Sequence, residues 1–415
     1  MKKEVVIIGG GIIGLCSAYF LLKEGHKVTV IDKSDMTEGA SYVNAGFVSP
    51  SHIIPLSAPG MMKKGLKWMF NKSSPLYIKP RLDIDFLKWS WAFNKMCSEK
   101  HVKNSIPVIK NIAELSQELY DEITVSEGFK FHHDKNGLLM LCNSEEGFDS
   151  EVKIAKIAQK AGLKVDILSK SEVQNLEPET AINASGATHY KNDSHCTPTE
   201  FMEEMKAFLV KSGITIFKNE EVVDIEVTNR KVVEVKTKTQ TLKADEFVLA
   251  TGTWTGEFLK KIGINLLLQP GKGYRINSLK PTGIKMPAIL VESKAAVTPM
   301  NGFTRYAGTM EIAGLNTNIN KVRVEAIANS VNKYYPDIRI TEEEKQQASF
   351  GFRPLSFDGL PYIGRPDEFE NLTIATGHAM LGWTMGTGTG KLVSEIVSNS
   401  KTSLNLKPFN VNRKF

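Results

Sequence analysis

The sequence predicts an α/β fold in which a parallel sheet is interleaved with an antiparallel one. Three observations predict it. Residues 5–32 have the pattern of strand, glycine-rich turn, helix and strand; a buried β-branched run returns at 247–250; and a last strand, turn and helix follow at 372–390. Short runs between these segments, separated by turn residues, indicate antiparallel strands. The chain is therefore expected to leave and re-enter its first domain.

Length and composition exclude several classes of protein. A chain of 415 residues suits two domains, and 41% apolar with 24% charged residues is ordinary for a soluble protein. The net charge of +6 is spread among acids, which argues against nucleic acid as a partner and slightly favours small anions. The first strand begins within four residues, no apolar run suits a membrane span, and the cysteines are far apart. We therefore expect a cytoplasmic protein with reduced thiols.

The turn after the first predicted strand has the pattern of a dinucleotide cradle. Gly9 permits the tight turn, Gly11 lets the backbone approach a pyrophosphate, and Gly14 lets the helix pack on the strands. The helix N-terminus then presents unpaired N–H groups to the phosphates. Asp32 ends the second strand, where a carboxylate accepts both ribose hydroxyls and repels a 2′-phosphate. This pattern argues against NADP.

The next segments are predicted in turn. Small and polar residues at 39–50 predict a loop that passes close to a flat ligand, with a solvent loop as the alternative. The pattern from Ile53 to about Val125 is helical. We expect prolines to break these helices, at Pro55, Pro59, Pro75, Pro80 and Pro107. Met62–Phe70 carries an apolar face opposite three lysines, which predicts a core helix or, less commonly, a helix on a membrane surface.

Lys130–Cys142 is predicted to form an antiparallel hairpin with its turn at 134–137. Neighbouring residues of a strand point to opposite faces, so His132 and His133 cannot chelate one metal ion side by side. No other spacing of histidine, cysteine or acidic residues suggests a metal site. The sequence therefore predicts none.

The remaining elements complete the two domains. Helices are predicted at 151–160, 198–212 and 321–335, and strands at 214–217, 222–225, 232–235 and 247–250. The strand 247–250 leads into a phosphate-sized turn at 251–254, a second mark of a dinucleotide domain. Short strands within 267–314 predict the antiparallel sheet. A glycine-rich helix start at 386–390 would direct a third helix N-terminus at the ligand.

Four segments together resemble one family: the opening fingerprint, 250–252, 353–364 and 377–390. They resemble the D-amino-acid oxidase superfamily of flavoproteins, and the resemblance covers nearly the whole chain. More narrowly, 44–50, 58–60, 272–274 and 377–383 look like bacterial D-amino acid dehydrogenases and the related hydroxy-D-proline dehydrogenases.

The resemblance implies a Rossmann-like FAD-binding domain interleaved with an antiparallel-sheet α+β substrate domain. The FAD-binding domain would comprise 1–52, 143–262 and 346–415, and the substrate domain 53–142 and 263–345. FAD is the implied cofactor. The residues expected to bind or adjoin it are Gly9, Gly11, Ile13, Gly14, Asp32, Lys33, Ser41, Asn44, Ala45, Gly46, Val223, Thr251, Gly252, Trp254, Gly377, Leu381, Gly382, Trp383 and Thr384.

The resemblance also implies a substrate site. Arg353, in a Gly-x-Arg-Pro segment, would hold the substrate carboxylate with its planar guanidinium, a surface ion pair being the alternative. Tyr274 and His378 are the other candidate catalytic residues, although His378 could simply hydrogen-bond the turn. Arg305 and His52 are further candidates for the substrate pocket.

The implied reaction is oxidative deamination of a D-amino acid. Hydride passes from Cα to flavin N5, and the imine is hydrolysed to a 2-oxo acid. Dehydrogenation of cis-4-hydroxy-D-proline or D-proline is the alternative. A respiratory quinone or another acceptor would take the electrons, with peripheral contact at the inner face of the cell membrane. A flavin-dependent factor that modifies nucleic acid is disfavoured by the mixed charges. An NAD-binding module without catalysis is disfavoured because it leaves the C-terminal glycines without a ligand.

Overall fold

A parallel sheet carries the turn predicted to be a dinucleotide cradle. The computed structural model describes residues 2–63, 65 and 74–414, and in these ranges the sheet has six strands in the order β10-β2-β1-β14-β21-β20. Neighbouring strands are parallel except for β20, which is antiparallel to β21. The strands are β1 (Glu4–Ile8), β2 (Lys27–Ile31), β10 (Thr215–Phe217), β14 (Glu246–Leu249), β20 (Tyr362–Gly364) and β21 (Leu372–Thr376).

The parallel pairings join segments that are far apart in the sequence. β1 lies between β2 and β14, and β14 lies beside β21, so the chain leaves this sheet and re-enters it, as predicted. All of β1 after Glu4 is buried, which is expected of a parallel strand that is covered on both faces. The predicted α/β fold is confirmed.

Side chains that alternate along β1 face two separate cores. Val5 and Ile7 lie in the core formed with α1 (Ile12–Lys23) and α11 (Gly386–Ser398). Val6 and Ile8 lie in a core on the other face, formed with α8 (Thr255–Lys260) and other segments. The alternation follows from the two-residue period of a strand.

The two helices that cover the cradle face are in close contact at Gly390. A Cβ atom built on Gly390 of α11 would lie 2.5 Å from the carbonyl carbon of Cys16 in α1. Backbone atoms cannot move aside as a flexible side chain can. We therefore expect Gly390→Ala to push the helices apart and to lower the free energy of unfolding by about 1–3 kcal/mol. Urea unfolding followed by circular dichroism measures this change.

Gly256→Ala in α8 is the matched control. The nearest neighbours of its Cβ atom, the Leu266 carbonyl oxygen and Leu268 Cβ, would lie 3.9 Å away, so the alanine fits without strain. Because alanine favours a helix over glycine, this variant should be as stable as the parent or slightly more stable. Equal stability of the two variants would contradict the close contact between α1 and α11.

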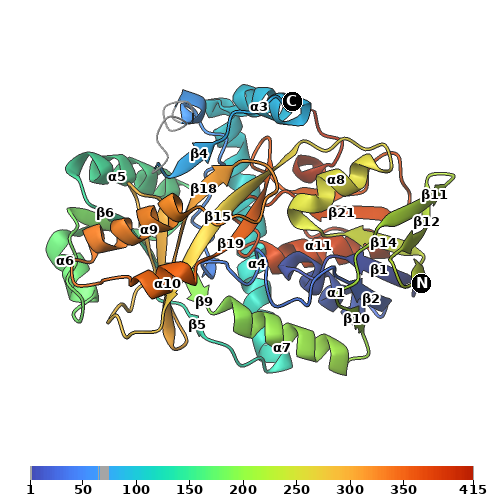
Figure 1. The fold of residues 1–415 in the computed structure, drawn as a ribbon, viewed down its shortest axis with the longest axis horizontal. Coiled ribbons are helices and arrows are strands. Elements are labelled where there is room, and N and C mark those ends of the chain that lie inside the picture. Colours follow the sequence, from blue (N-terminus) through green and yellow to red (C-terminus); the bar gives the residue numbers. More distant parts are fainter. Residues whose placement is uncertain (1, 64, 66–73, 415) are drawn as a thin grey trace.

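A second, larger sheet lies beside the first (Figure 1). In the described ranges it has nine strands, in the order β19-β15-β18-β17-β16-β6-β8-β7, with β4 added beside β18. Most pairings are antiparallel, as predicted for the second sheet, and β16–β6 and β18–β4 are parallel. The strands are β4 (Leu76–Ile78), β6 (Leu138–Cys142), β7 (Val165–Ser169), β8 (Gly186–Tyr190), β15 (Leu268–Ser278), β16 (Ala288–Leu290), β17 (Ala295–Met300), β18 (Phe303–Ile312) and β19 (Ser349–Ser356).

Two small antiparallel sheets complete the strand pairings. β11 (Asp224–Thr228), β12 (Lys231–Lys236) and β13 (Thr241–Lys243) form one of them. The other has the order β3-β9-β5 and consists of β3 (Phe47–Val48), β9 (Ser194–Cys196) and β5 (His133–Asp134).

The structure changes three details of the sequence prediction. The predicted hairpin at 130–142 is wrong, because β5 pairs with β9 while β6 pairs with β8 and β16 in the larger sheet. β7 and β8 also pair in the larger sheet, although the predicted FAD-binding segment 143–262 included them. Pro107 does not break a helix: it lies inside α4 (Glu99–Glu127), whose buried face outweighs one lost backbone hydrogen bond.

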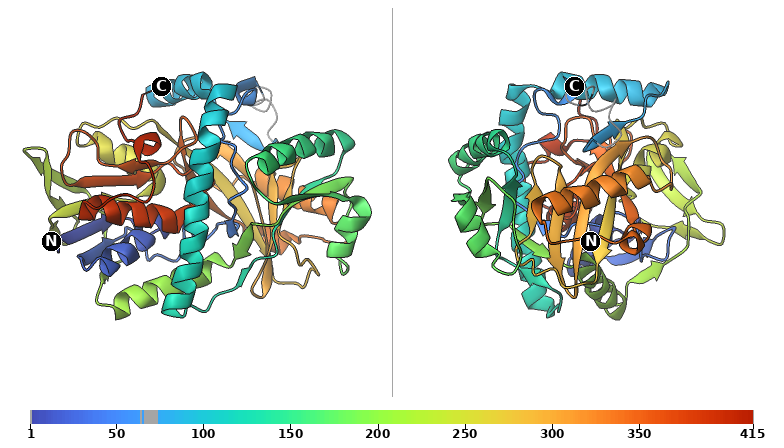
Figure 2. Two further views of the ribbon diagram at one scale, coloured as in Figure 1. Left: turned by 180° about the vertical axis from the view of Figure 1, so that it is seen from behind. Right: turned by 60° about the vertical axis from the view of Figure 1, so that its left-hand side comes forward.

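Helices surround both sheets. α4 runs along the back of the molecule, where Figure 2 (left) shows it passing in front of α11. The two helices pack closely, because a Cβ atom on Gly388 of α11 would lie 3.0 Å from the Ile112 carbonyl oxygen of α4. The other helices are α3 (Ile84–Met96), α5 (Glu145–Lys160), α6 (Lys170–Leu176), α7 (Pro198–Lys211), α9 (Lys321–Tyr334) and α10 (Glu342–Gln346).

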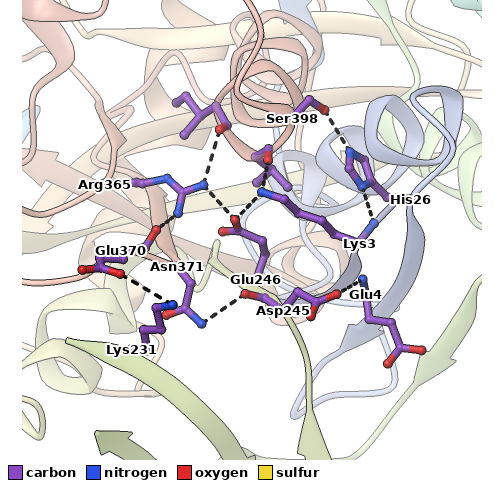
Figure 3. Close-up of polar contacts among 12 residues, drawn as sticks. Lys3, Glu4, His26, Lys231, Asp245, Glu246, Arg365, Glu370, Asn371 and Ser398 are labelled. Atoms are coloured by element: carbon purple, nitrogen blue, oxygen red, sulfur yellow. Dashed lines mark hydrogen bonds and ion pairs between the residues drawn. The ribbon is translucent and has the colours of Figure 1, made fainter. Parts of the chain in front are cut away.

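A charged cluster joins the strands of the parallel sheet at their amino ends, away from the cradle (Figure 3). The buried carboxylate of Glu246, the first residue of β14, accepts hydrogen bonds from Lys3 Nζ at 2.7 Å and Arg365 Nη2 at 3.0 Å. Lys3 precedes β1 and Arg365 follows β20. The cluster therefore holds separate strands of the sheet in register.

The segment predicted as a core or membrane-surface helix, Met62–Phe70, lies mostly outside the described residues. In the ranges that are described, no helix combines the length and the apolar character needed to cross a membrane. The four cysteines, which we expected to be reduced, are free.

Candidate active site

A cavity of about 1440 Å³ lies where the two sheets face each other. One part of its wall is the cradle and the loops that follow β2 and β14. Another part comes from β15, β18 and β19 of the larger sheet, and a third from the loop at 378–384. Ligands of open parallel sheets bind at the carboxyl ends of the strands, where this cavity lies.

Three glycines of the cradle act through their lack of a side chain. Gly9 has φ of +107°, and a Cβ atom there would lie 2.5 Å from the Ala250 carbonyl oxygen. A Cβ on Gly14 would lie 1.8 Å from the Gly9 carbonyl oxygen, so Gly14 packs α1 on the turn, as predicted. Gly11 lines the cavity just before α1, where Ile12 N–H donates to Ser41 Oγ at 2.9 Å.

Asp32 fixes the second edge of the cradle. Its Oδ2 accepts from Gly10 N–H at 2.7 Å, and its Oδ1 accepts from Ser34 N–H at 2.8 Å. Carboxylate oxygens have further lone pairs, so the same group can still accept hydroxyls from a ribose. Asp32 therefore organises the turn and also presents an acceptor to the cavity.

The turn after β14 borders the cavity. Thr251, Gly252 and Trp254 line the cavity, and Thr376 Oγ1 donates to the Gly252 carbonyl oxygen at 2.8 Å. Lys33 Nζ lies 3.8 Å from the centroid of the Trp254 ring, a cation–π contact at the cradle rim.

Val223, whose backbone the resemblance would place at the adenine side of FAD, has both of its polar backbone groups bonded within the chain. Its N–H donates to Lys236 O at 2.8 Å, and its carbonyl oxygen accepts from Lys261 Nζ at 2.9 Å. Val222, one residue earlier, lines the cavity. Because Val223 pairs with Lys236, its polar backbone groups point away from the cavity.

The loop at 377–384 presents backbone amides to the cavity. Gly377 has φ of +82°, and Leu381 N–H donates to His378 O at 2.8 Å. No described residue accepts a hydrogen bond from the N–H of Gly382, Trp383 or Thr384, all of which line the cavity. Unpaired donors at a helix start suit a ligand oxygen that carries negative charge.

Arg305 supports the loop that faces this turn. Its guanidinium donates to the carbonyl oxygens of Tyr42, at 3.0 Å, and Asn44, at 2.6 Å. The Asn44 side chain in turn accepts from Gly46 N–H at 2.9 Å. Arg305 lines the cavity, and these bonds show that it supports the loop, while a contact with substrate stays a prediction. Burial lowers the pKa of Arg305 to about 9.

Arg353 is a cation without an acidic partner. Nη1 donates to Thr309 O at 2.8 Å, and no acidic group of the described residues pairs with the guanidinium. The group lies over Gly273, where a Cβ atom would come within 2.2 Å of Nη1. Burial lowers the pKa of Arg353 to about 10, so it remains charged at neutral pH. A shielded cation of this kind is stabilised by an anion from outside the chain.

The polar groups of Tyr274 and His378 are engaged by the protein. Tyr274 hydroxyl contacts Glu311 Oε2 at 3.2 Å and Asn320 N at 3.3 Å. His378 Nε2 lies 2.9 Å from Thr389 Oγ1, so its ring bonds α11, not the turn backbone. Burial lowers the pKa of His378 to about 3 and keeps the ring neutral. Both residues line the cavity, and a role in the reaction stays a prediction.

His52 lies in the cavity wall, and its neighbour Ser51 bonds a carboxyl group that sequence reasoning missed. Burial lowers the pKa of His52 to about 4. Its neighbour Ser51 donates its N–H, at 3.1 Å, and its hydroxyl to Asp193. Burial raises the pKa of Asp193 to about 7. The two residues are 142 positions apart, and no local pattern could have indicated their contact.

The chain belongs to the FAD dependent oxidoreductase family called DAO, whose model matches residues 4–396. Three solved structures illustrate the shared fold. Glycine oxidase from Geobacillus kaustophilus has 22% identity and a TM-score of 0.78, over 100% of this chain and 99% of that one. L-proline dehydrogenase from P. horikoshii has 20% identity and a TM-score of 0.76, over 99% of this chain and 96% of that one. L-amino acid deaminase from Proteus vulgaris has 14% identity and a TM-score of 0.74, over 100% of this chain and 97% of that one.

FAD is therefore the cofactor, and the residues present fit it. The cradle offers a helix N-terminus to a pyrophosphate and the Asp32 carboxylate to a ribose. The unpaired amides at 382–384 suit the pyrimidine edge of a flavin, which gains negative charge on reduction. The cavity volume of about 1440 Å³ also leaves room for a substrate beside an extended dinucleotide.

Proposed function

We propose that the chain is an FAD-dependent D-amino acid dehydrogenase that oxidises the Cα–N bond of a small substrate. The observation that carries this proposal is Arg353, a shielded cation in the cavity wall without an acidic partner among the described residues. Glycine oxidase, L-proline dehydrogenase and L-amino acid deaminase share the fold, and their named substrates all carry nitrogen beside a carboxylate. The preference for D-amino acids rests on the sequence resemblance.

Each group of residues in the cavity would have a separate role in the reaction. The planar guanidinium of Arg353 binds the substrate carboxylate in two hydrogen bonds and so fixes the orientation of Cα. His52, neutral because burial lowers its pKa, accepts a hydrogen bond from the substrate amine. The amides of 382–384 would hold the flavin edge. Bound FAD would supply the two-electron oxidation chemistry.

A cyclic imino acid, cis-4-hydroxy-D-proline or D-proline, is the second candidate substrate. The cavity wall includes the apolar side chains of Ile54, Met140 and Ile289. Such a wall suits a ring of methylene groups whose only cationic group is the ring nitrogen. Oxidation would then give a cyclic imine.

For the electron acceptor we propose a respiratory quinone. Among the described residues, α3 carries exposed apolar side chains at Ile84, Leu87 and Trp91, and Leu82 just before it is fully exposed. An exposed apolar helix face is typical of proteins that rest on a membrane, where quinones reside. This face supports peripheral contact with the inner side of the cell membrane.

Anaerobic mixing with single substrates tests the proposed reaction. D-alanine, D-proline or cis-4-hydroxy-D-proline should bleach the absorption of the oxidised flavin at least tenfold faster than the L-enantiomers do. Reduction by L-amino acids alone would contradict the proposal.

A second experiment tests the electron acceptor. The reduced enzyme is mixed with oxygen or with a soluble quinone analogue. Slow reoxidation by oxygen and fast reoxidation by quinone are expected, whereas rapid formation of hydrogen peroxide would make the protein an oxidase.

A further inference from the structure

Three polar side chains meet on one face of the small sheet β3-β9-β5. Asp134 of β5 is the register partner of His195 in β9. Directly opposed residues of an antiparallel pair point to the same face. His132 precedes Asp134 by two residues and lies on that face as well, because side chains along a strand alternate. Two imidazoles and one carboxylate are thus brought together from segments about sixty residues apart.

The distances suit coordination of a single ion. One potential ligand atom from each of His132, Asp134 and His195 lies within 4.8 Å of the other two. His132 Nε2 is 3.3 Å from Asp134 Oδ2, and the two histidine rings have centroids 5.3 Å apart. Ligand atoms around one tetrahedral ion lie about 3.3 Å apart, given metal–nitrogen bonds of about 2.0–2.1 Å. A small rotation of the side chains closes the remaining gap.

His195 provides an independent observation. Its exposed fraction is 0%, and neither ring nitrogen forms a well-aligned hydrogen bond with a described residue. The Pro299 carbonyl lies against the ring, where it can orient an imidazole N–H. A buried imidazole with an unused lone pair is costly unless a ligand from outside the chain takes it up.

His132 has the outer contact that a metal-binding histidine needs. Its Nδ1 lies 3.2 Å from Thr197 Oγ1. When Nδ1–H donates to that oxygen, the Nε2 lone pair is left free for an ion. The adjacent His133 lies on the other face, where its Nε2 contacts Ser194 Oγ at 2.9 Å and its ring stacks on Phe131.

We propose that His132, Asp134 and His195 bind a divalent transition-metal ion, with Zn²⁺ as the best match. Two imidazoles and a carboxylate suit zinc, and water would complete a tetrahedral site. The ion reaches the site from solvent, because 53% of the Asp134 side chain and 23% of the His132 side chain are exposed.

The position of the site indicates a structural role. None of the three ligands lines the cavity, so the ion takes no part in the proposed oxidation. β9 pairs on its other side with β3, where Phe47 opposes His195, and Cys196 N–H donates to Gly46 O at 2.9 Å. An ion on His195 would therefore fasten β5 to β9 next to the loop that borders the flavin site.

Zinc titration of the untagged flavoprotein tests the proposal. After treatment with a chelator, the protein should bind one equivalent of Zn²⁺ by isothermal titration calorimetry, and saturating Zn²⁺ should raise its melting temperature. Asp134→Asn and His132→Gln should each weaken Zn²⁺ binding by at least about tenfold and remove the thermal shift. Both residues are partly exposed, so neither change should prevent folding.

His133→Gln is the matched control, since it removes the neighbouring imidazole from the opposite face. This variant should bind Zn²⁺ as the parent protein does. The proposal is overturned if the parent shows no saturable binding of one equivalent. It is equally overturned if Asp134→Asn and His132→Gln bind Zn²⁺ as tightly as His133→Gln.

Discussion

Arg353→Ala is expected to lower kcat/KM for amino acid substrates by at least tenfold while the flavin content stays unchanged. Loss of a shielded, charge-assisted pair costs about 2–5 kcal/mol. The side chain lies on β19 and donates to Thr309 O, which is not part of the cradle, so its removal leaves the cradle intact. Steady-state kinetics and the ratio of flavin to protein absorbance measure the two effects separately.

Arg305→Ala is the informative comparison for this prediction. Arg305 holds the carbonyl oxygens of Tyr42 and Asn44, so its loss should loosen that loop and reduce the flavin content. Arg339→Ala removes an exposed arginine and should change neither quantity. If Arg305→Ala abolished turnover with full flavin while Arg353→Ala did not, the carboxylate partner would be Arg305.

Local patterns were sufficient to predict the parallel sheet. The apolar run of β1, the glycine turn and the apolar helix α1 follow one another directly, so neighbouring residues alone indicate each of them. The pairing of β5 with β9 was not predictable in this way. β5 is a two-residue strand whose partner, β9, comes about sixty residues later, and nothing in 130–142 distinguishes that pairing from a hairpin.

The same division holds within the candidate site. The sequence could indicate the cradle, the turn after β14 and the loop at 377–384, because they are local motifs whose glycines have steric reasons. The substrate side depends on which loops face each other. The carboxyl group of Asp193 and the loop-supporting bonds of Arg305 both come from long-range contacts, so the sequence could not indicate them.

Asp32→Ala is expected to raise the dissociation constant for FAD by about 100-fold or more and to yield mostly colourless protein. A hydrogen bond to a charged group contributes about 1.5–3 kcal/mol, and this carboxylate would accept two from the ribose. It also holds Gly10 N–H at 2.7 Å, so the cradle turn itself would relax. Titration of the apoprotein with FAD, followed by flavin fluorescence, gives the dissociation constant.

Asp35→Ala controls for the loss of a negative charge near the cradle. Asp35 is exposed and accepts its hydrogen bonds from Thr37, so FAD affinity should not change. Asp32→Asn keeps one acceptor oxygen and removes the charge, and we expect an affinity between those of the parent and the alanine variant. If Asp32→Ala retained a full complement of FAD, the ribose would have to be held by other groups of the cavity wall.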